Sequence, residues 1–165
     1  MDYKVLADLL FPNVKMTIEE AEAKYPARDL PEGAKVTRFA PSPTGFVHFG
    51  GMYQAVVNER LAHQSGGVFY LRIEDTDKKR EVEGGVQTII DAFSSFGLPF
   101  DEGATLDGEI GAYGPYRQSQ RAAIYQTFAK SLVQRGMAYP CFATEEELAA
   151  MRAEQEANKE NFGYY

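Results

Sequence analysis

Residues 36–51, with the sequence V-T-R-F-A-P-S-P-T-G-F-V-H-F-G-G, constrain the fold of this chain more than any other segment. Strand-forming residues at 35–39 run into a loop at 41–45, whose prolines and glycine continue neither a strand nor a helix. His48 and two glycines then stand at the start of a predicted helix. The first N–H groups of a helix have no partners within it and carry the positive end of its dipole. The segment therefore predicts a phosphate-binding turn with a histidine beside it.

A second segment, residues 68–80, reads V-F-Y-L-R-I-E-D-T-D-K-K-R, and its apolar first half predicts a buried strand. The amphipathic stretch 52–64 predicts a helix between the two strands. Such a unit joins parallel strands, and ligands bind beyond their carboxyl ends. Arg38 and Glu74 lie at those ends, so we expect both side chains in the crevice that His48 faces. A guanidinium suits a carboxylate and a carboxylate suits an ammonium, which predicts a phosphorylated nucleotide beside an amino acid.

Three motifs in this order, R-F-A-P-S-P-T-G-x-x-H-F-G-G, R-I-E-D-T-D and G-P-Y-R-Q-S, resemble the glutamyl-tRNA synthetase family of class I aminoacyl-tRNA synthetases. The resemblance extends from about Lys35 to the end of the chain. It implies an α/β fold, namely the first half of a Rossmann-like class I synthetase catalytic domain, with a parallel sheet and covering helices. It also implies a ligase that activates glutamate with ATP and Mg²⁺ to glutamyl-adenylate and transfers it to tRNA(Glu).

The resemblance assigns roles to residues of the first two motifs. The positions of the catalytic and ATP-binding signature are His48, Gly50 and Gly51. Phe49 and Gly51 differ from the common forms of that signature, so the resemblance implies an ATP contact that is altered in detail. The implied glutamate site has Arg38 for the side-chain carboxylate, Glu74 for the α-amino group, Ser42 for orientation, and Ala40. The implied supporting residues are Asp77 and Arg80.

The protein itself is predicted to hold no metal. Cys141-Phe142-Ala143 stands where some bacterial members of the family carry a Cys-x-Cys zinc pair, and one cysteine cannot supply the thiolates of such a site. We interpret Cys141 as a small buried apolar residue. Two alternatives to the glutamate site stay open. The carboxylates at 74, 75 and 77 could bind a divalent cation, or Arg38 and Glu74 could simply form an ion pair with each other.

Composition limits the class of protein. A chain of 165 residues with 44% hydrophobic residues can bury one core and is short for two full domains. No apolar run is long enough to cross a membrane, and the single cysteine favours a reducing compartment. We therefore expect a cytoplasmic protein. A monomer is a separate expectation. The net charge of −7 argues against binding nucleic acid through bulk charge, so tRNA would meet local basic strips such as 78–80, or Arg117 with Arg121.

The chain is predicted to have three parts. In the first part, an N-terminal extension, a capping box of Thr17 and Glu20 begins a short helix that ends near Tyr25. Leu6 and Leu9 of this extension are expected to pack on the main body. We interpret it as a structural appendage, with a partner-binding arm as the alternative. The three parts are this extension at 1–34, the Rossmann-like catalytic half at 35–138, and the truncated start of the inserted acceptor-stem-binding region at 139–165.

Apolar residues at helical spacing predict two further covering helices, over 86–96 and over 118–134. A second capping box, formed by Thr144 and Glu147, opens a last helix whose outer half is solvated. His63, on the helix 52–64, is interpreted as an ordinary surface or core histidine.

The loop that closes over ATP, the second half of the sheet and the anticodon-binding region of the family are missing from these residues. We therefore expect an N-terminal fragment that does not catalyse by itself. Three alternatives stay open: a shortened paralogue that glutamylates a modified tRNA base, a small stand-alone nucleotidylyltransferase, and a non-catalytic binding fragment. The R-I-E-D-T-D and G-P-Y-R segments do not belong to the nucleotidylyltransferase pattern.

Overall fold

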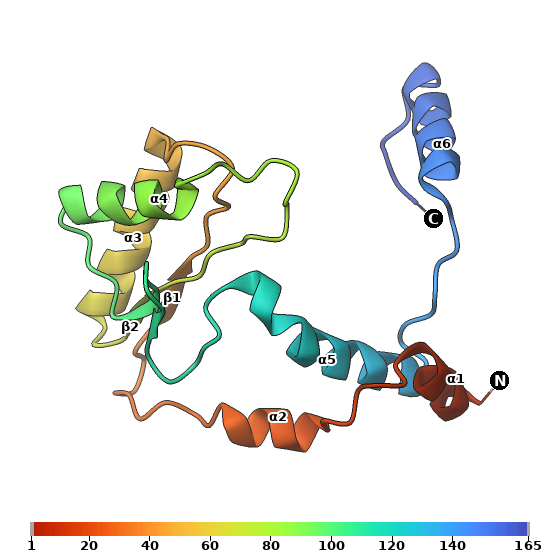
Figure 1. The fold of residues 1–165 in the computed structure, drawn as a ribbon, viewed down its shortest axis with the longest axis horizontal. Coiled ribbons are helices and arrows are strands. Elements are labelled where there is room, and N and C mark those ends of the chain that lie inside the picture. The colour runs from red at the N-terminus through yellow and green to blue at the C-terminus, as the bar shows by residue number, and fades with distance from the viewer. Residues whose placement is uncertain (1, 165) are drawn as a thin grey trace.

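The computed structural model describes residues 2–164 of the chain (Figure 1). Its elements in chain order are α1 (Tyr3–Leu10), α2 (Ile18–Lys24), β1 (Val36–Phe39), α3 (Phe49–Gln64), β2 (Val68–Leu71), α4 (Gly85–Ser95), β3 (Glu102–Ala104), β4 (Glu109–Ile110), a 3-10 helix (Gln118–Arg121), α5 (Ala122–Gln134) and α6 (Glu145–Ala157). Figure 1 shows α3 and α4 beside the strands, α1 and α2 along α5, and α6 standing apart.

The sheet has the strand order β1-β2-β3-β4, in which β1, β2 and β3 are parallel and β4 is antiparallel to β3. The predicted strand-helix-strand unit is confirmed, because β1 and β2 pair directly with Val36 opposite Val68. The connecting helix α3 begins at Phe49, earlier than the predicted residue 52. The antiparallel β4 makes the sheet mixed. The sequence did not indicate β3 and β4 because they span only 3 and 2 residues.

The core lies between the sheet and the helices α3 and α4. Phe39, Phe69 and Leu71 are buried and share one apolar cluster with residues of both helices. The rings of Phe39 and Phe93 lie 4.8 Å apart between centroids. The predicted helix over 86–96 is confirmed as α4, although Phe96 at its C-terminal cap is 69% exposed. A fully buried side chain of this kind contributes roughly 1.5–3 kcal/mol, which anchors the end of β1 from which the signature turn departs.

The N-terminal extension packs on α5 through both of its helices (Figure 1). The predicted capping box is confirmed: the Glu20 N–H donates to Thr17 Oγ1 at 3.2 Å, and the Thr17 N–H donates to Glu20 Oε2 at 2.9 Å. The helix α1 was not predicted. Its buried residue is Ala7, whereas Leu9 is 73% exposed. The expected packing of the leucines is therefore wrong at Leu9, because Leu9 is two residues from the buried Ala7 and lies on another face of α1.

The last helix, α6, confirms the second capping box, since the Glu147 N–H donates to Thr144 Oγ1 at 3.2 Å. The linker before it carries Cys141, which is exposed. The prediction of a buried Cys141 is wrong, because the linker runs outside the core cluster. A backbone hydrogen bond at Ala143 holds the pKa of this thiol below its ordinary value. Within residues 2–164, no helix is both long and apolar enough to cross a membrane.

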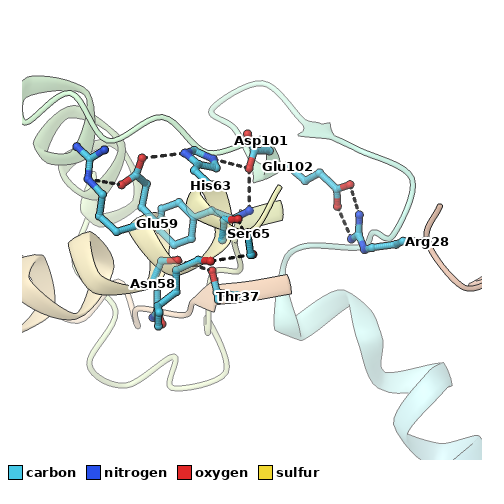
Figure 2. A network of polar contacts seen from close by, with 12 residues as sticks. Arg28, Thr37, Asn58, Glu59, His63, Ser65, Asp101 and Glu102 are labelled. Atoms are coloured by element: carbon cyan, nitrogen blue, oxygen red, sulfur yellow. Dashed lines mark hydrogen bonds and ion pairs between the residues drawn. The ribbon is translucent and has the colours of Figure 1, made fainter. Parts of the chain in front are cut away.

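His63 lies between two carboxylates (Figure 2), in the last turn of α3 and thus at the opposite end of that helix from His48. Its Nδ1 is 2.8 Å from Glu59 Oε1, and its Nε2 is 2.9 Å from Asp101 Oδ2. Asp101 also accepts a 2.7 Å hydrogen bond from the N–H of Phe69, so the cluster ties α3 to β2. The hydrogen bond to Asp101, aided by Glu59 and opposed by burial, raises the pKa of His63.

This cluster predicts a pH dependence of stability. Because the folded-state pKa of His63 is raised, its stabilisation is complete below the unfolded value of about 6.5 and is lost as the pH rises through the folded pKa. An exposed pair such as His63 with Asp101 contributes about 0.2–1 kcal/mol, and the partly buried pair of His63 with Glu59 adds to it. In urea unfolding, the parent should therefore lose on the order of 1 kcal/mol more than His63→Ala between about pH 6 and about pH 9. Equal losses in both proteins would contradict the assignment.

Candidate functional site

The predicted phosphate-binding turn borders a cavity of about 610 Å³ between the end of β1, the Pro-Gly loop and the head of α3. Five of the seven residues predicted for catalysis, ATP binding or glutamate binding line this cavity. The lining residues are Phe39, Ala40, Pro41, Ser42, Thr44, Gly45, Phe46, Val47, His48, Gly50, Gly51, Gln54 and Ile89. The cavity therefore brings together His48, both glycines, Ala40 and Ser42, as the sequence predicts.

His48 is the N-cap residue of α3. Its Nδ1 accepts a 3.3 Å hydrogen bond from the Gly51 N–H, which also donates to the carbonyl oxygen of His48 at 3.0 Å. A neutral imidazole whose Nδ1 accepts carries its proton on Nε2. His48 can therefore offer an Nε2–H donor at the positive end of a helix of 16 residues.

The glycines of this region have different roles. A Cβ on Gly50 would lie 3.2 Å from His48 Nδ1 and crowd the imidazole, whereas one on Gly51 would meet its nearest neighbours at 3.6 Å, an ordinary contact. Gly51 thus contributes its N–H rather than space. Gly85 was not predicted as a site residue, yet a Cβ there would lie 2.7 Å from the carbonyl oxygen of Pro43. The Gly84-Gly85 pair before the predicted helix is the signal that could have indicated this close approach.

Arg38 and Glu74 meet at the ends of β1 and β2, with Arg38 Nη2 at 3.9 Å from Glu74 Oε1. Neither belongs to the lining of the cavity described above. Side chains alternate along a strand, so Arg38 points away from the face on which its neighbour Phe39 lines that cavity. Arg72, which the sequence did not single out, lies closer to the same carboxylate, at 3.1 Å. The sequence predicted one crevice for Arg38, Glu74 and His48. The structure instead places the pair of Arg38 and Glu74 and the cavity beside His48 on two faces of the sheet.

The three carboxylates that could have shared a cation turn to different partners. Glu74 pairs with Arg72, and Asp77 Oδ2 lies 2.6 Å from Arg80 Nε on the surface. The hydrogen bond from Arg80 lowers the pKa of Asp77. Asp75 is buried and turns toward Ser119. Across the described residues 2–164, no group of three or more His, Cys, Asp or Glu side chains is placed to hold a metal ion.

Asp75 joins the second motif to the third. Its Oδ1 accepts from the Ser119 N–H at 2.8 Å, and its Oδ2 accepts from the Ser119 hydroxyl at 2.7 Å. Burial by itself would raise the pKa of Asp75, but these two hydrogen bonds outweigh it and the pKa is lowered. Sequence reasoning missed this pair, although both residues belong to motifs that it had identified.

Backbone hydrogen bonds complete the junction of the three motifs. The segment 72–75 lies between the signature turn and residues 116–119. On one side the Glu74 N–H donates to the carbonyl of Pro41, and on the other the Ile73 N–H donates to the carbonyl of Tyr116, both at 2.9 Å. Three segments that are far apart in the sequence therefore form one continuous structure around the ends of β1 and β2.

Comparison with known proteins identifies the family to which this chain belongs. Residues 35–164 match the family model of the tRNA synthetases class I (E and Q), catalytic domain. This chain belongs to that family. The match includes all three motifs and both faces of the site, and it confirms the resemblance found in the sequence. It also excludes the stand-alone nucleotidylyltransferase as the family of this chain.

Individual synthetases of the family are similar over the whole chain. The chain is 61% identical over 166 residues to the glutamate–tRNA ligase of Acetivibrio thermocellus, and 59% identical over 166 residues to that of Clostridium perfringens. Each alignment covers 100% of this chain and 30% of the relative. The chain thus spans about 30% of the length of these curated relatives.

Solved synthetase structures agree with the fold. A glutamate tRNA ligase from Elizabethkingia meningosepticum, in complex with its amino acid, has 43% sequence identity and a TM-score of 0.70, covering 81% of this chain and 26% of that chain. The glutamate-tRNA synthetase from Elizabethkingia anophelis has 41% identity and a TM-score of 0.68, covering 79% and 26%. The predicted α/β synthetase fold is confirmed.

Proposed function

We propose that the protein to which these residues belong is a glutamate–tRNA ligase. It joins glutamate to AMP from ATP, releases pyrophosphate, and then transfers the glutamyl group to the terminal ribose of tRNA(Glu). The observation that carries the proposal is the junction of the three motifs at the ends of β1 and β2, in a chain whose similar relatives bear that name. The ligand of the Elizabethkingia meningosepticum enzyme, its amino acid, supports glutamate as the substrate.

In the proposed reaction the α-carboxylate of glutamate attacks the α-phosphate of ATP, and the bond to pyrophosphate breaks. No covalent bond to the protein forms. The protein positions the reactants and stabilises the charge that develops on the phosphate oxygens. His48 Nε2–H and the N–H groups at the start of α3 are the proposed donors. Gly50 leaves room for the imidazole, and Gly51 holds it through its N–H. Mg²⁺ arrives bound to ATP.

The proposed glutamate site lies on the neighbouring strand ends. The guanidinium of Arg38 pairs with the side-chain carboxylate of the substrate, and Glu74 accepts from its ammonium group. Ala40 and Ser42, which border the cavity, orient the substrate toward ATP. Asp77 and Arg80 support the loop that follows. The divisions 1–34, 35–138 and 139–165, the monomeric state and the cytoplasmic location also stay predictions.

The direct test is the exchange of labelled pyrophosphate into ATP by the full-length protein, with and without tRNA(Glu). We expect exchange that depends on glutamate and not on glutamine. Exchange with glutamine alone would overturn the glutamate assignment. A tRNA that lacks its terminal adenosine distinguishes the ligase from the shortened paralogue. The paralogue can still glutamylate a base of such a tRNA, whereas the ligase has no terminal ribose to which it can transfer glutamate. The 165 residues alone are predicted to show no sustained exchange, since they lack groups that would close the crevice.

A further inference from the structure

The N-terminal extension is joined to the third motif by specific contacts as well as by packing. The Tyr25 hydroxyl donates to the carbonyl oxygen of Gly114 at 2.7 Å, and the Tyr113 hydroxyl donates to that of Pro26 at 2.9 Å. The guanidinium of Arg28 lies 3.7 Å from the centre of the Tyr113 ring. The segment between α2 and β1 is thus attached directly to the loop at 113–117.

Arg28 extends this attachment into the sheet. Its Nη1 lies 2.5 Å from Glu102 Oε1 and its Nη2 lies 2.7 Å from Oε2, a bidentate pair with β3 (Figure 2). Both side chains are largely buried, with 16% and 15% exposed. Glu102 Oε2 also accepts a 2.7 Å hydrogen bond from the hydroxyl of Tyr116. Burial and this bond raise the pKa of Tyr116 to about 12, so its hydroxyl remains a donor at neutral pH.

Tyr116 in turn borders the proposed amino-acid site. Its carbonyl oxygen accepts from the Ile73 N–H at 2.9 Å, and the next residue after Ile73 is Glu74. Contacts therefore run from Arg28 through Glu102 and Tyr116 to the backbone beside Glu74. Loss of Arg28 would leave Glu102 partly buried and uncompensated, and a displacement of about 1 Å in a positioning group can cost roughly 100-fold in rate.

We propose that Arg28 is a positioning residue of the amino-acid site, which holds Tyr116 through Glu102 and thereby places the Glu74 carboxylate for the α-amino group of glutamate. This role rests on the function proposed above. It gives the extension a part in substrate recognition, in place of the appendage predicted from the sequence.

The chain offers a matched control for this role. Lys130 of α5 also fastens the extension, with its Nζ at 2.7 Å from Asp8 Oδ1 and at 3.1 Å from the carbonyl oxygen of Val14. Its side chain is 17% exposed, similar to that of Arg28. These partners lie in the extension itself, so Lys130→Met loosens the extension without removing a contact of the path to Glu74.

The experiment compares Arg28→Ala, Arg28→Lys and Lys130→Met in the full-length protein by pyrophosphate exchange. For Arg28→Ala we expect the KM for glutamate to rise about tenfold and the KM for ATP to change less than about twofold. Arg28→Lys should recover part of the loss, because it keeps the charge without the bidentate geometry. Lys130→Met should leave both KM values within about twofold of the parent.

Tyr116→Phe provides a second route if Arg28→Ala does not fold, since it removes one oxygen and keeps the ring. It should also raise the KM for glutamate. Where Arg28→Ala does fold, the double variant of Arg28→Ala with Tyr116→Phe should show less than the sum of the two single effects. Equal increases in both KM values, an equal effect of Lys130→Met, or an unchanged KM for glutamate in a folded Arg28 or Tyr116 variant would overturn the positioning role alone. A parent without glutamate-dependent exchange would instead overturn the proposed function, and the positioning role with it.

Discussion

Replacing Arg38 by alanine is expected to abolish detectable binding of glutamate at millimolar concentrations in the full-length protein. The guanidinium is 40% exposed and lies at 3.9 Å from Glu74, so it can turn to a substrate carboxylate without breaking a close ion pair. Removing it would leave the substrate carboxylate unpaired, a loss on the order of 2–5 kcal/mol. Solvent at the site reduces this loss toward its lower end. Isothermal titration calorimetry with glutamate measures it directly.

Arg60→Ala is the matched control, because Arg60 is an arginine of α3 that is 67% exposed and pairs with Glu59. It should bind glutamate as the parent does. Arg38→Lys should bind with intermediate affinity, since lysine keeps the charge and loses the fork. If Arg38→Ala binds glutamate nearly as tightly as the parent, the side-chain carboxylate is recognised elsewhere, and Arg72 becomes the next residue to replace.

His48→Ala is expected to lower the rate of glutamate activation by roughly 100- to 1000-fold, as for the loss of one transition-state donor. The affinity for glutamate should stay close to that of the parent, because His48 borders the cavity of the signature turn and not the strand ends that carry Arg38. Pyrophosphate exchange measures the rate, and calorimetry measures the affinity. Unchanged turnover would remove His48 from the mechanism.

Capping of α3 has to be separated from catalysis in this experiment, because His48 Nδ1 also caps the helix. Loss of an N-cap side chain costs about 0.5–2 kcal/mol of stability. His48→Asn restores an N-cap acceptor but not the imidazole Nε2–H. A folded His48→Asn with the same large loss of rate would assign the effect to the donor, whereas recovery of the rate would assign it to the cap.

The sequence by itself determined the elements whose signals are local. Apolar spacing located α4, and the two capping boxes located the starts of α2 and α6. The alternation of loop, helix and strand identified the parallel pair of β1 and β2. These signals lie within a few residues of one another along the chain, so no knowledge of the tertiary structure is needed to read them. The three motifs were likewise sufficient by themselves to identify the family.

Only the tertiary structure decided which side chains meet. Arg28 and Glu102 are 74 residues apart, and Asp75 and Ser119 are 44 apart, so their pairing depends on how the extension and the third motif fold back onto the sheet. The exposure of Cys141 and the antiparallel β4 are decided in the same way. The separation of Arg38 from the cavity beside His48 follows from the alternation of side chains at the end of β1. Sequence spacing brings residues to the same edge of the sheet, but strand register and long-range packing assign them to its two faces.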